Sequence, residues 1–255
     1  MVTLKHFGVG AYTWPWAARA KKLTALEIAR RAQAAGLDTI QLCDNIPLFE
    51  LTESELATLK AAGLRVELGV RGLANVPKAL ALAKKLDAPL LRLAIDTHDH
   101  EPEPQEIIAA LQELLPVLEE QGCTLALENH GRLSARALAW IIYTLESPLV
   151  GICLDTANSM GAGEDLQTVL DHLAPLTLCL HLKDVTIQPV GHLMGFDIRG
   201  CEPGTGLVDF ATTLERMGDR CQSVILEQWP PEPSVEEDWA QLGIQRLKES
   251  QARRL

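Results

Sequence analysis

Paired cysteines and positive charge are both scarce in this sequence. The six cysteines form no CxxC pair, and four of them lie in or beside expected strands, which favours reduced thiols over disulfides or a zinc site. The chain has 23 Lys and Arg against 34 Asp and Glu, so its net charge is −11. This balance argues against binding along a phosphate backbone, and we expect no nucleic-acid partner.

Long apolar runs are absent as well. No segment has the roughly 20 consecutive apolar residues that a membrane-spanning helix needs, so we expect no membrane partner. The opening segment, MVTLKHFGVGAY, is too short and too strand-like for a signal peptide, and we expect a cytoplasmic protein. The hydrophobic content of 47% still allows a large core, and 255 residues suffice for one large α/β domain.

Short apolar segments alternate with helical patterns along the whole chain. Thr24 with Glu27, and Thr52 with Glu55, are capping boxes that indicate helix starts. The expected strands are 7–12, 38–44, 65–72, 89–96, 123–128, 149–155, 176–184 and 223–229. This alternation without a linker predicts a single (β/α)8 TIM barrel over residues 1–255. An open doubly wound sheet would instead carry a GxGxxG turn after the first strand, where the sequence reads AYTWPWA.

Four strands each end with a ligand-type side chain on the inward face. Strand side chains alternate with period two, so Glu128 shares a face with the small Ala126, while leucines point the other way. The same parity selects Asp155, His181 and Glu227, and barrel sites are built at these strand ends. Three carboxylates would repel one another there unless a divalent cation bound them. The donor set favours one Mn²⁺, with Mg²⁺, Co²⁺ or Zn²⁺ as alternatives.

Other polar residues near the expected barrel mouth could bind a substrate. This set comprises Arg71, Asn129, His130, Lys183 and Arg199. Segment 185–206 is rich in Gly and Pro, lacks periodicity, and is far longer than a usual α/β connection, so we expect a lid loop. Glu67 and Arg92 lie deeper on their strands, which favours a structural salt-bridge network inside the barrel. Tyr12 follows the first strand and fits either a pocket wall or packing under a loop.

Several of these segments together resemble the xylose isomerase-like superfamily of sugar phosphate isomerases and epimerases. They are ENH at 128–130, LDTAN at 154–158, HLKD at 181–184, PGTGLVDF at 203–210 and LE at 226–227. The resemblance spans most of the chain and implies a TIM barrel whose metal is held by Glu128, Asp155, His181 and Glu227. In the ketose 3-epimerase branch, the residues matching Glu128 and Glu227 also act as acid and base on opposite faces of the substrate.

The sequence departs from that branch at two positions. Asn158 stands where the branch usually carries a His, and we include Asn158 among the expected substrate-binding residues. The stretch GRLSAR offers only Ser134 where a second Glu is usual. The resemblance therefore implies metal-dependent keto–enediol chemistry more strongly than it implies ketose 3-epimerase specificity.

The leading expectation is a metal-dependent isomerase or epimerase acting on a sugar, sugar phosphate or related keto-polyol through an enediolate. One glutamate would remove a proton and the other return it. A lyase of the inosose dehydratase type, expelling a β-hydroxyl from the same enediolate, stays open, as does a non-catalytic sugar-binding protein. Apurinic-site endonucleases share the fold but need many more histidine ligands for a zinc cluster, whereas only one of the seven histidines here lies on the four key strands. The exact substrate and the oligomeric state, including a homo-oligomer, also stay open.

Overall fold

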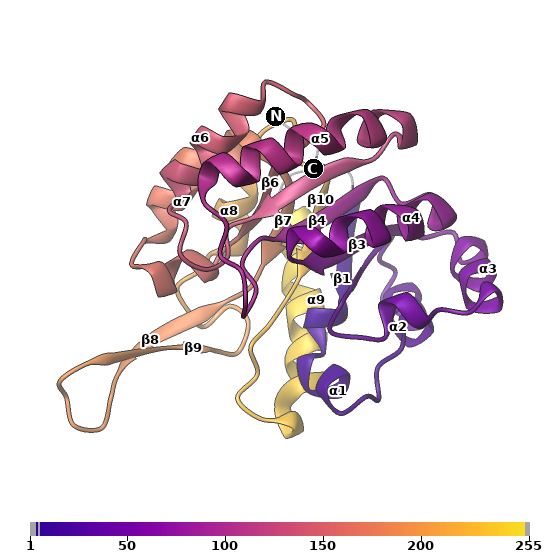
Figure 1. Cartoon of the computed structure of the whole chain (residues 1–255). Helices are drawn as coiled ribbons and strands as arrows, with labels where there is room; N and C mark the ends of the chain where they lie inside the picture. The colour runs from indigo at the N-terminus through magenta and orange to yellow at the C-terminus, as the bar shows by residue number, and fades with distance from the viewer. Residues whose placement is uncertain (1–3, 5, 253–255) are drawn as a thin grey trace.

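Leucine-rich segments such as LTLCLHL can be buried on both faces, as the strands of a parallel barrel must be. In the computed structural model, which describes residue 4 and residues 6–252, the parallel strands close in the order β1-β10-β7-β6-β5-β4-β3-β2. Helices surround this barrel (Figure 1). The predicted single (β/α)8 barrel is confirmed.

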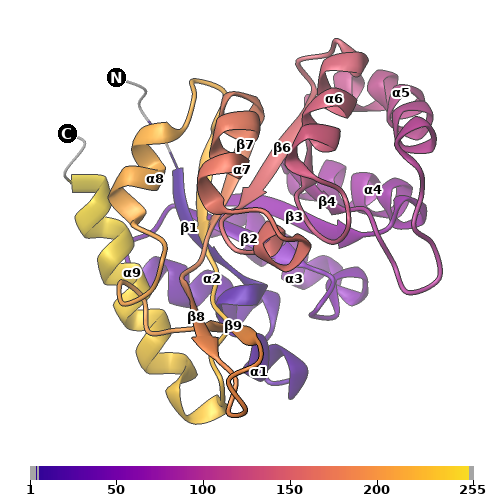
Figure 2. The ribbon, with the colours of Figure 1, turned by 90° about the vertical axis from the view of Figure 1, so that its left-hand side faces the viewer.

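The barrel strands are β1 His6–Gly10, β2 Thr39–Cys43, β3 Arg65–Arg71, β4 Leu90–Ala94, β5 Thr124–Glu128, β6 Val150–Asp155, β7 Thr177–Leu182 and β10 Ser223–Leu226. The helices are α1 Pro15–Arg19, α2 Ala25–Ala34, α3 Glu53–Ala61, α4 Val76–Leu86, α5 Pro104–Gln121, α6 Ala135–Leu145, α7 Leu166–Leu173, α8 Phe210–Arg216 and α9 Glu236–Ala252. Helix α9 runs along the outside of the barrel beside α8 (Figure 2). Among the described residues, no helix combines the length and apolar character needed to cross a membrane.

Local sequence signals set several element boundaries. The predicted capping box of α3 is confirmed, since Thr52 and Glu55 each accept a hydrogen bond from the other's backbone N–H. At α2 only half of the box forms, because the Glu27 carboxylate turns instead to Arg30 and Arg31. Gly8 in β1 allows the close strand approach, since a Cβ there would lie 2.2 Å from the Thr39 carbonyl oxygen.

The segment after β7 differs from the irregular loop expected from its composition. Residues Val185–Pro189 and Phe196–Gly200 pair as an antiparallel hairpin, β8–β9. Figure 1 shows this hairpin projecting from the body of the barrel. The alternation of apolar and polar residues in VTIQ and FDIR is the period-two signal of a strand, although Gly and Pro between them dominate the composition.

Candidate active site

The four strand-end residues predicted as ligands come together at the carboxyl ends of β5, β6, β7 and β10. Asp155 and His181 are register partners across β6 and β7, and Glu128 ends the neighbouring strand. His181 Nδ1 lies 3.4 Å from Glu128 Oε1 and 3.0 Å from Glu227 Oε1. All four side chains are buried. Strand parity therefore located a real cluster, and its role in metal binding stays a prediction.

The cluster has the dimensions and donor types of a divalent-cation site. Ligand atoms of Glu128, Asp155 and His181 all lie within 4.8 Å of one another. His181 Nδ1 is buried and makes no hydrogen bond, although carboxylate oxygens surround it. Carboxylate oxygens with one imidazole nitrogen suit Mg²⁺, Mn²⁺, Co²⁺ or Zn²⁺. The residues present fit a cation held by these three side chains, with Glu227 adjoining them.

Cationic side chains next to this cluster lower the pKa of two of its carboxylates, Glu128 and Glu227, whereas burial raises the pKa of Asp155. Arg92 Nη2 lies 2.6 Å from Glu128 Oε2, and Lys183 Nζ lies 3.1 Å from Glu227 Oε2. Burial alone would raise the pKa of Glu128, but Arg92 and His181 outweigh it and lower that pKa to about 2. Burial also acts against ionised Glu227, yet His181 and Lys183 hold its pKa well below the usual range. Ionised carboxylates are the form that binds a metal.

The predicted structural network deep in the barrel includes Glu67 but not Arg92. The Arg92 guanidinium reaches Glu128 at the mouth, while Glu67 pairs instead with Arg65, whose Nε lies 2.8 Å from Glu67 Oε1. The position of Arg92 along β4 suggested a deep location, but its long side chain extends well beyond its own Cα toward the mouth. Arg92 is therefore a site residue that the sequence did not identify.

A small cavity of about 70 Å³ opens over the cluster. It is lined by Tyr12, Arg71, Arg92, Glu128, His130, Asn158, Lys183, Glu227 and Trp229. Arg71 is held in place, since it donates to the Asp96 carbonyl oxygen at 2.9 Å and its Nη2 lies 3.1 Å from His130 Nε2. Asn158 Nδ2 donates to Glu128 Oε1 at 3.3 Å. The structure thus brings four of the six predicted substrate-binding residues to one cavity.

The other two predicted substrate-binding residues lie elsewhere. Asn129 is buried and binds backbone groups of the next strand, donating to the Asp155 carbonyl oxygen and accepting from the Asp155 N–H. Its position, one residue after Glu128, turns it toward β6 rather than into the cavity. Arg199 lies on the projecting hairpin, exposed and paired with Asp197.

Trp229 is a cavity residue that the sequence did not identify. Its ring lies over Lys183, with Nζ 4.4 Å from the ring centroid. Trp229 is two residues after Glu227, so strand parity carried one step further would have pointed to it. Tyr12, whose place was open, lies on the wall of the same cavity.

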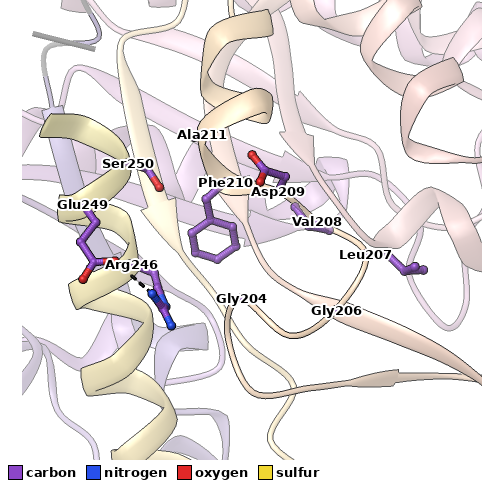
Figure 3. A pocket seen from close by; sticks show the side chains of 10 residues that line it. All are labelled: Gly204, Gly206, Leu207, Val208, Asp209, Phe210, Ala211, Arg246, Glu249 and Ser250. Atoms are coloured by element: carbon purple, nitrogen blue, oxygen red, sulfur yellow. Dashed lines mark hydrogen bonds and ion pairs between the residues drawn. The ribbon is translucent and has the colours of Figure 1, made fainter. Parts of the chain in front are cut away.

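A larger cavity of about 300 Å³ lies elsewhere, between residues 204–211 and α9 (Figure 3). The adjoining loop is organised around Asp184, whose carboxylate accepts the backbone N–H groups of Gly204, Gly206 and Val208. A Cβ on Gly206 would lie 2.4 Å from Asp184 Oδ1, which explains a glycine at that position. These backbone N–H groups already donate to Asp184 and are not available to a ligand in the cavity. None of the four clustered ligands lines this cavity, so we do not regard it as the active site.

Comparisons with known proteins agree with the fold. A family model described as xylose isomerase-like TIM barrel matches residues 29–250. The chain is 30% identical over 242 residues to a 3-oxo-isoapionate decarboxylase of Pectobacterium atrosepticum, covering 90% of this chain and 88% of that protein. A xylose isomerase domain protein from Planctomyces limnophilus has 21% identity and a TM-score of 0.74, covering 98% of this chain and 99% of that one. A xylose isomerase-like barrel from Mycobacterium smegmatis in complex with magnesium has 16% identity and a TM-score of 0.68, covering 95% and 97%. On the strength of the family model and the shared barrel, this chain belongs to the xylose isomerase-like TIM barrel family.

Proposed function

We propose that this protein is a metal-dependent lyase that decarboxylates a small polyhydroxylated 3-oxo acid. The observation that carries the proposal is the charge balance of the site. Three clustered carboxylates and three cationic side chains, Arg71, Arg92 and Lys183, adjoin the site, so these groups balance in formal charge once His181 is neutral, the form that binds a metal. A bound divalent cation would leave two positive charges in excess, which an anionic substrate would neutralise. A neutral ketose offers no such compensation.

The reaction we propose needs a site that stabilises negative charge on oxygen. The bond between the carboxylate carbon and C2 breaks, its electron pair moves toward the C3 oxygen to form an enolate, and carbon dioxide leaves. A proton then returns to C2. A divalent cation held by the cluster would supply the positive charge that stabilises the enolate oxygen. The relative from Pectobacterium atrosepticum, with its 3-oxo-isoapionate decarboxylase activity, supports this choice of reaction.

The cavity residues have complementary tasks in this proposal. Arg71 is held by Asp96 and His130 in a position to pair with the substrate carboxylate. Trp229 covers Lys183 and helps to exclude water, which strengthens the electrostatic interactions in the site. Burial raises the pKa of Tyr12, so its hydroxyl stays protonated and can donate a hydrogen bond to a substrate oxygen.

Isomerisation or epimerisation of a sugar is the second candidate, and one specific observation favours it. Glu128 and Glu227 approach His181 Nδ1 from β5 and β10, which are separated by β6 and β7 in the barrel. The two glutamates could therefore face opposite sides of a planar enediolate, one removing a proton and the other returning it.

Product analysis separates these reactions. The metal-loaded protein would be incubated with a panel of polyhydroxylated 3-oxo acids and with the matching neutral ketoses, and products identified by mass spectrometry. We expect loss of carbon dioxide from a 3-oxo acid and no change in the ketoses. An isomer of unchanged mass formed from a ketose, or loss of water, would overturn the decarboxylase assignment. Binding without any product would indicate a sugar-binding protein.

Substitution of the two glutamates distinguishes the mechanisms further. Glu→Gln keeps the shape and an oxygen ligand but removes basicity. A two-base isomerase should lose turnover by roughly 10²–10⁴-fold in both Glu128→Gln and Glu227→Gln at saturating metal. Decarboxylation needs no base for bond cleavage, so we expect a loss of that size in carbon dioxide release for at most one of the two variants. Equal large losses in both would favour the second candidate.

A further inference from the structure

A chain of polar side chains descends from His181 through the barrel interior. His181 Nε2 lies 2.8 Å from Gln41 Oε1, and Gln41 Nε2 donates to Glu67 Oε2 at 3.3 Å. Arg65 Nε donates to Glu67 Oε1 at 2.8 Å, and Arg65 Nη2 donates to Gln222 at 2.8 Å. Arg65 begins β3, so the chain links the catalytic end of the barrel to its opposite end.

These polar residues are unusual for their surroundings. Gln41 and Glu67 are fully buried register partners on β2 and β3. The neighbouring interior is filled by small and apolar side chains, namely Leu90, Ala126, Cys153, Leu178, Cys179 and Ile225. Burying an amide and a carboxylate is costly unless each is hydrogen-bonded, and apolar residues of similar volume would fill the same space. Packing therefore gives no reason for this chain, whereas its contact with His181 does.

The hydrogen-bonding capacities fix the direction of every bond in this chain. The Glu67 carboxylate, paired with Arg65, can only accept, so the Gln41 amide nitrogen must face it. The Gln41 carbonyl oxygen then faces His181 and requires a proton on Nε2. In a neutral imidazole, this leaves the lone pair on Nδ1, which is the nitrogen directed at Glu128 and Glu227.

We propose that Gln41, oriented by Glu67 and Arg65, is a positioning residue that holds His181 with Nε2 protonated and Nδ1 free to bind the divalent cation. This inference deepens the proposed function and rests on its metal requirement. Outer hydrogen-bond partners of metal-binding histidines commonly change metal affinity by about 10–100-fold. Here Gln41 orients the histidine, and Gln41 is itself oriented through Glu67 by Arg65, which begins β3 at the far end of the barrel.

The first test measures Mn²⁺ affinity by titration calorimetry. Gln41→Met keeps the approximate volume and removes the acceptor, and we expect its dissociation constant to rise by about 10–100-fold. The matched control is Gln121→Met on α5, remote from the chain, which should bind as the wild type does. Equal affinity of Gln41→Met and wild type would overturn the positioning role. Failure of the wild type itself to bind any divalent cation would overturn both this inference and the proposed function.

A double-mutant cycle tests whether Glu67 acts through Gln41. Glu67→Gln removes the obligate acceptor, so the Gln41 amide loses its fixed orientation and we expect an intermediate loss of affinity. In the Gln41→Met background, Glu67→Gln should have no further effect on the dissociation constant. Additive effects of the two substitutions would contradict the relay. Glu67→Gln also serves as an independent test should Gln41→Met fail to fold.

A spectroscopic readout separates positioning from general loosening of the core. In ¹⁵N-labelled protein saturated with Mg²⁺, the Nε2–H resonance of His181, identified by its absence in His181→Ala, should be shifted downfield by the bond to Gln41. Gln41→Met should move this proton upfield while the remaining histidine signals stay in place. An unchanged His181 resonance would show that Gln41 does not position the ring.

Discussion

Substitution of Lys183 should change the affinity for metal and the affinity for substrate in opposite directions. Its Nζ lies 2.8 Å from Asp155 Oδ2 and 3.1 Å from Glu227 Oε2, so it partly neutralises the carboxylates that would hold a cation. Burial opposes its charge, but Asp155 and Glu227 raise the pKa of Lys183 above its usual value. The ammonium group therefore stays charged and repels a divalent ion nearby.

We predict that Lys183→Met binds Mn²⁺ about tenfold more tightly, a change of about 1.4 kcal/mol, because one like charge is removed. The same variant should show a raised KM for an anionic substrate. Titration calorimetry and steady-state kinetics measure the two effects separately. Lys183→Arg retains the charge and is the control for affinity. Weaker metal binding in Lys183→Met would instead make Lys183 a support for the ligand set.

At the scale of elements, the β8–β9 hairpin connects to the site through Trp229. The backbones of hairpin and site meet closely at Gly200, where a Cβ would lie 1.9 Å from the Trp229 carbonyl oxygen. Trp229 in turn covers Lys183. Leu193, Met194 and Phe196 of the hairpin are 80%, 83% and 73% exposed, which is unusual for large apolar side chains. The hairpin therefore has apolar surface available to cover a filled cavity.

We predict that the hairpin acts as a lid and becomes protected when ligand binds. Chymotrypsin cleavage after Leu193, Met194 or Phe196, followed by mass spectrometry, should slow in the presence of saturating Mn²⁺ and substrate. Cleavage after Tyr143, an exposed residue of α6 remote from the site, provides the internal reference. Equal cleavage rates in the hairpin with and without ligands would rule out this lid.

At the scale of the whole molecule, the features that depend on rigid periodicity were predictable from the sequence. Strand alternation located Glu128, Asp155 and His181, because a barrel brings the ends of its strands together. Contacts across the barrel were not predictable in this way. Gln41 and His181 are 140 residues apart and meet only because β2 and β7 both face the interior. The reach of Arg92 likewise depends on the direction of a long side chain, which strand parity does not determine.

The barrel as a whole should become more stable when the cluster binds a cation. The native state gathers three buried carboxylates that are far apart in the unfolded chain, so a divalent ion binds the folded form preferentially. At a concentration 100 times the dissociation constant, linkage gives about 2.7 kcal/mol of stabilisation. For a chain of this size, we predict a rise in Tm of about 5–10 °C by scanning calorimetry, reversed by a chelator.

A comparison of two aspartates shows whether that stabilisation comes from this cluster. Asp155→Ala removes a ligand and should abolish the Tm shift, together with the binding of about one divalent ion per chain. Asp171→Ala removes an exposed carboxylate that pairs with Arg216 on the surface, and should retain the full shift. A nonspecific effect of Mn²⁺ on the protein surface does not depend on the buried Asp155, so it would persist in both variants. A full shift in Asp155→Ala would place the stabilising ion outside the cluster at the strand ends.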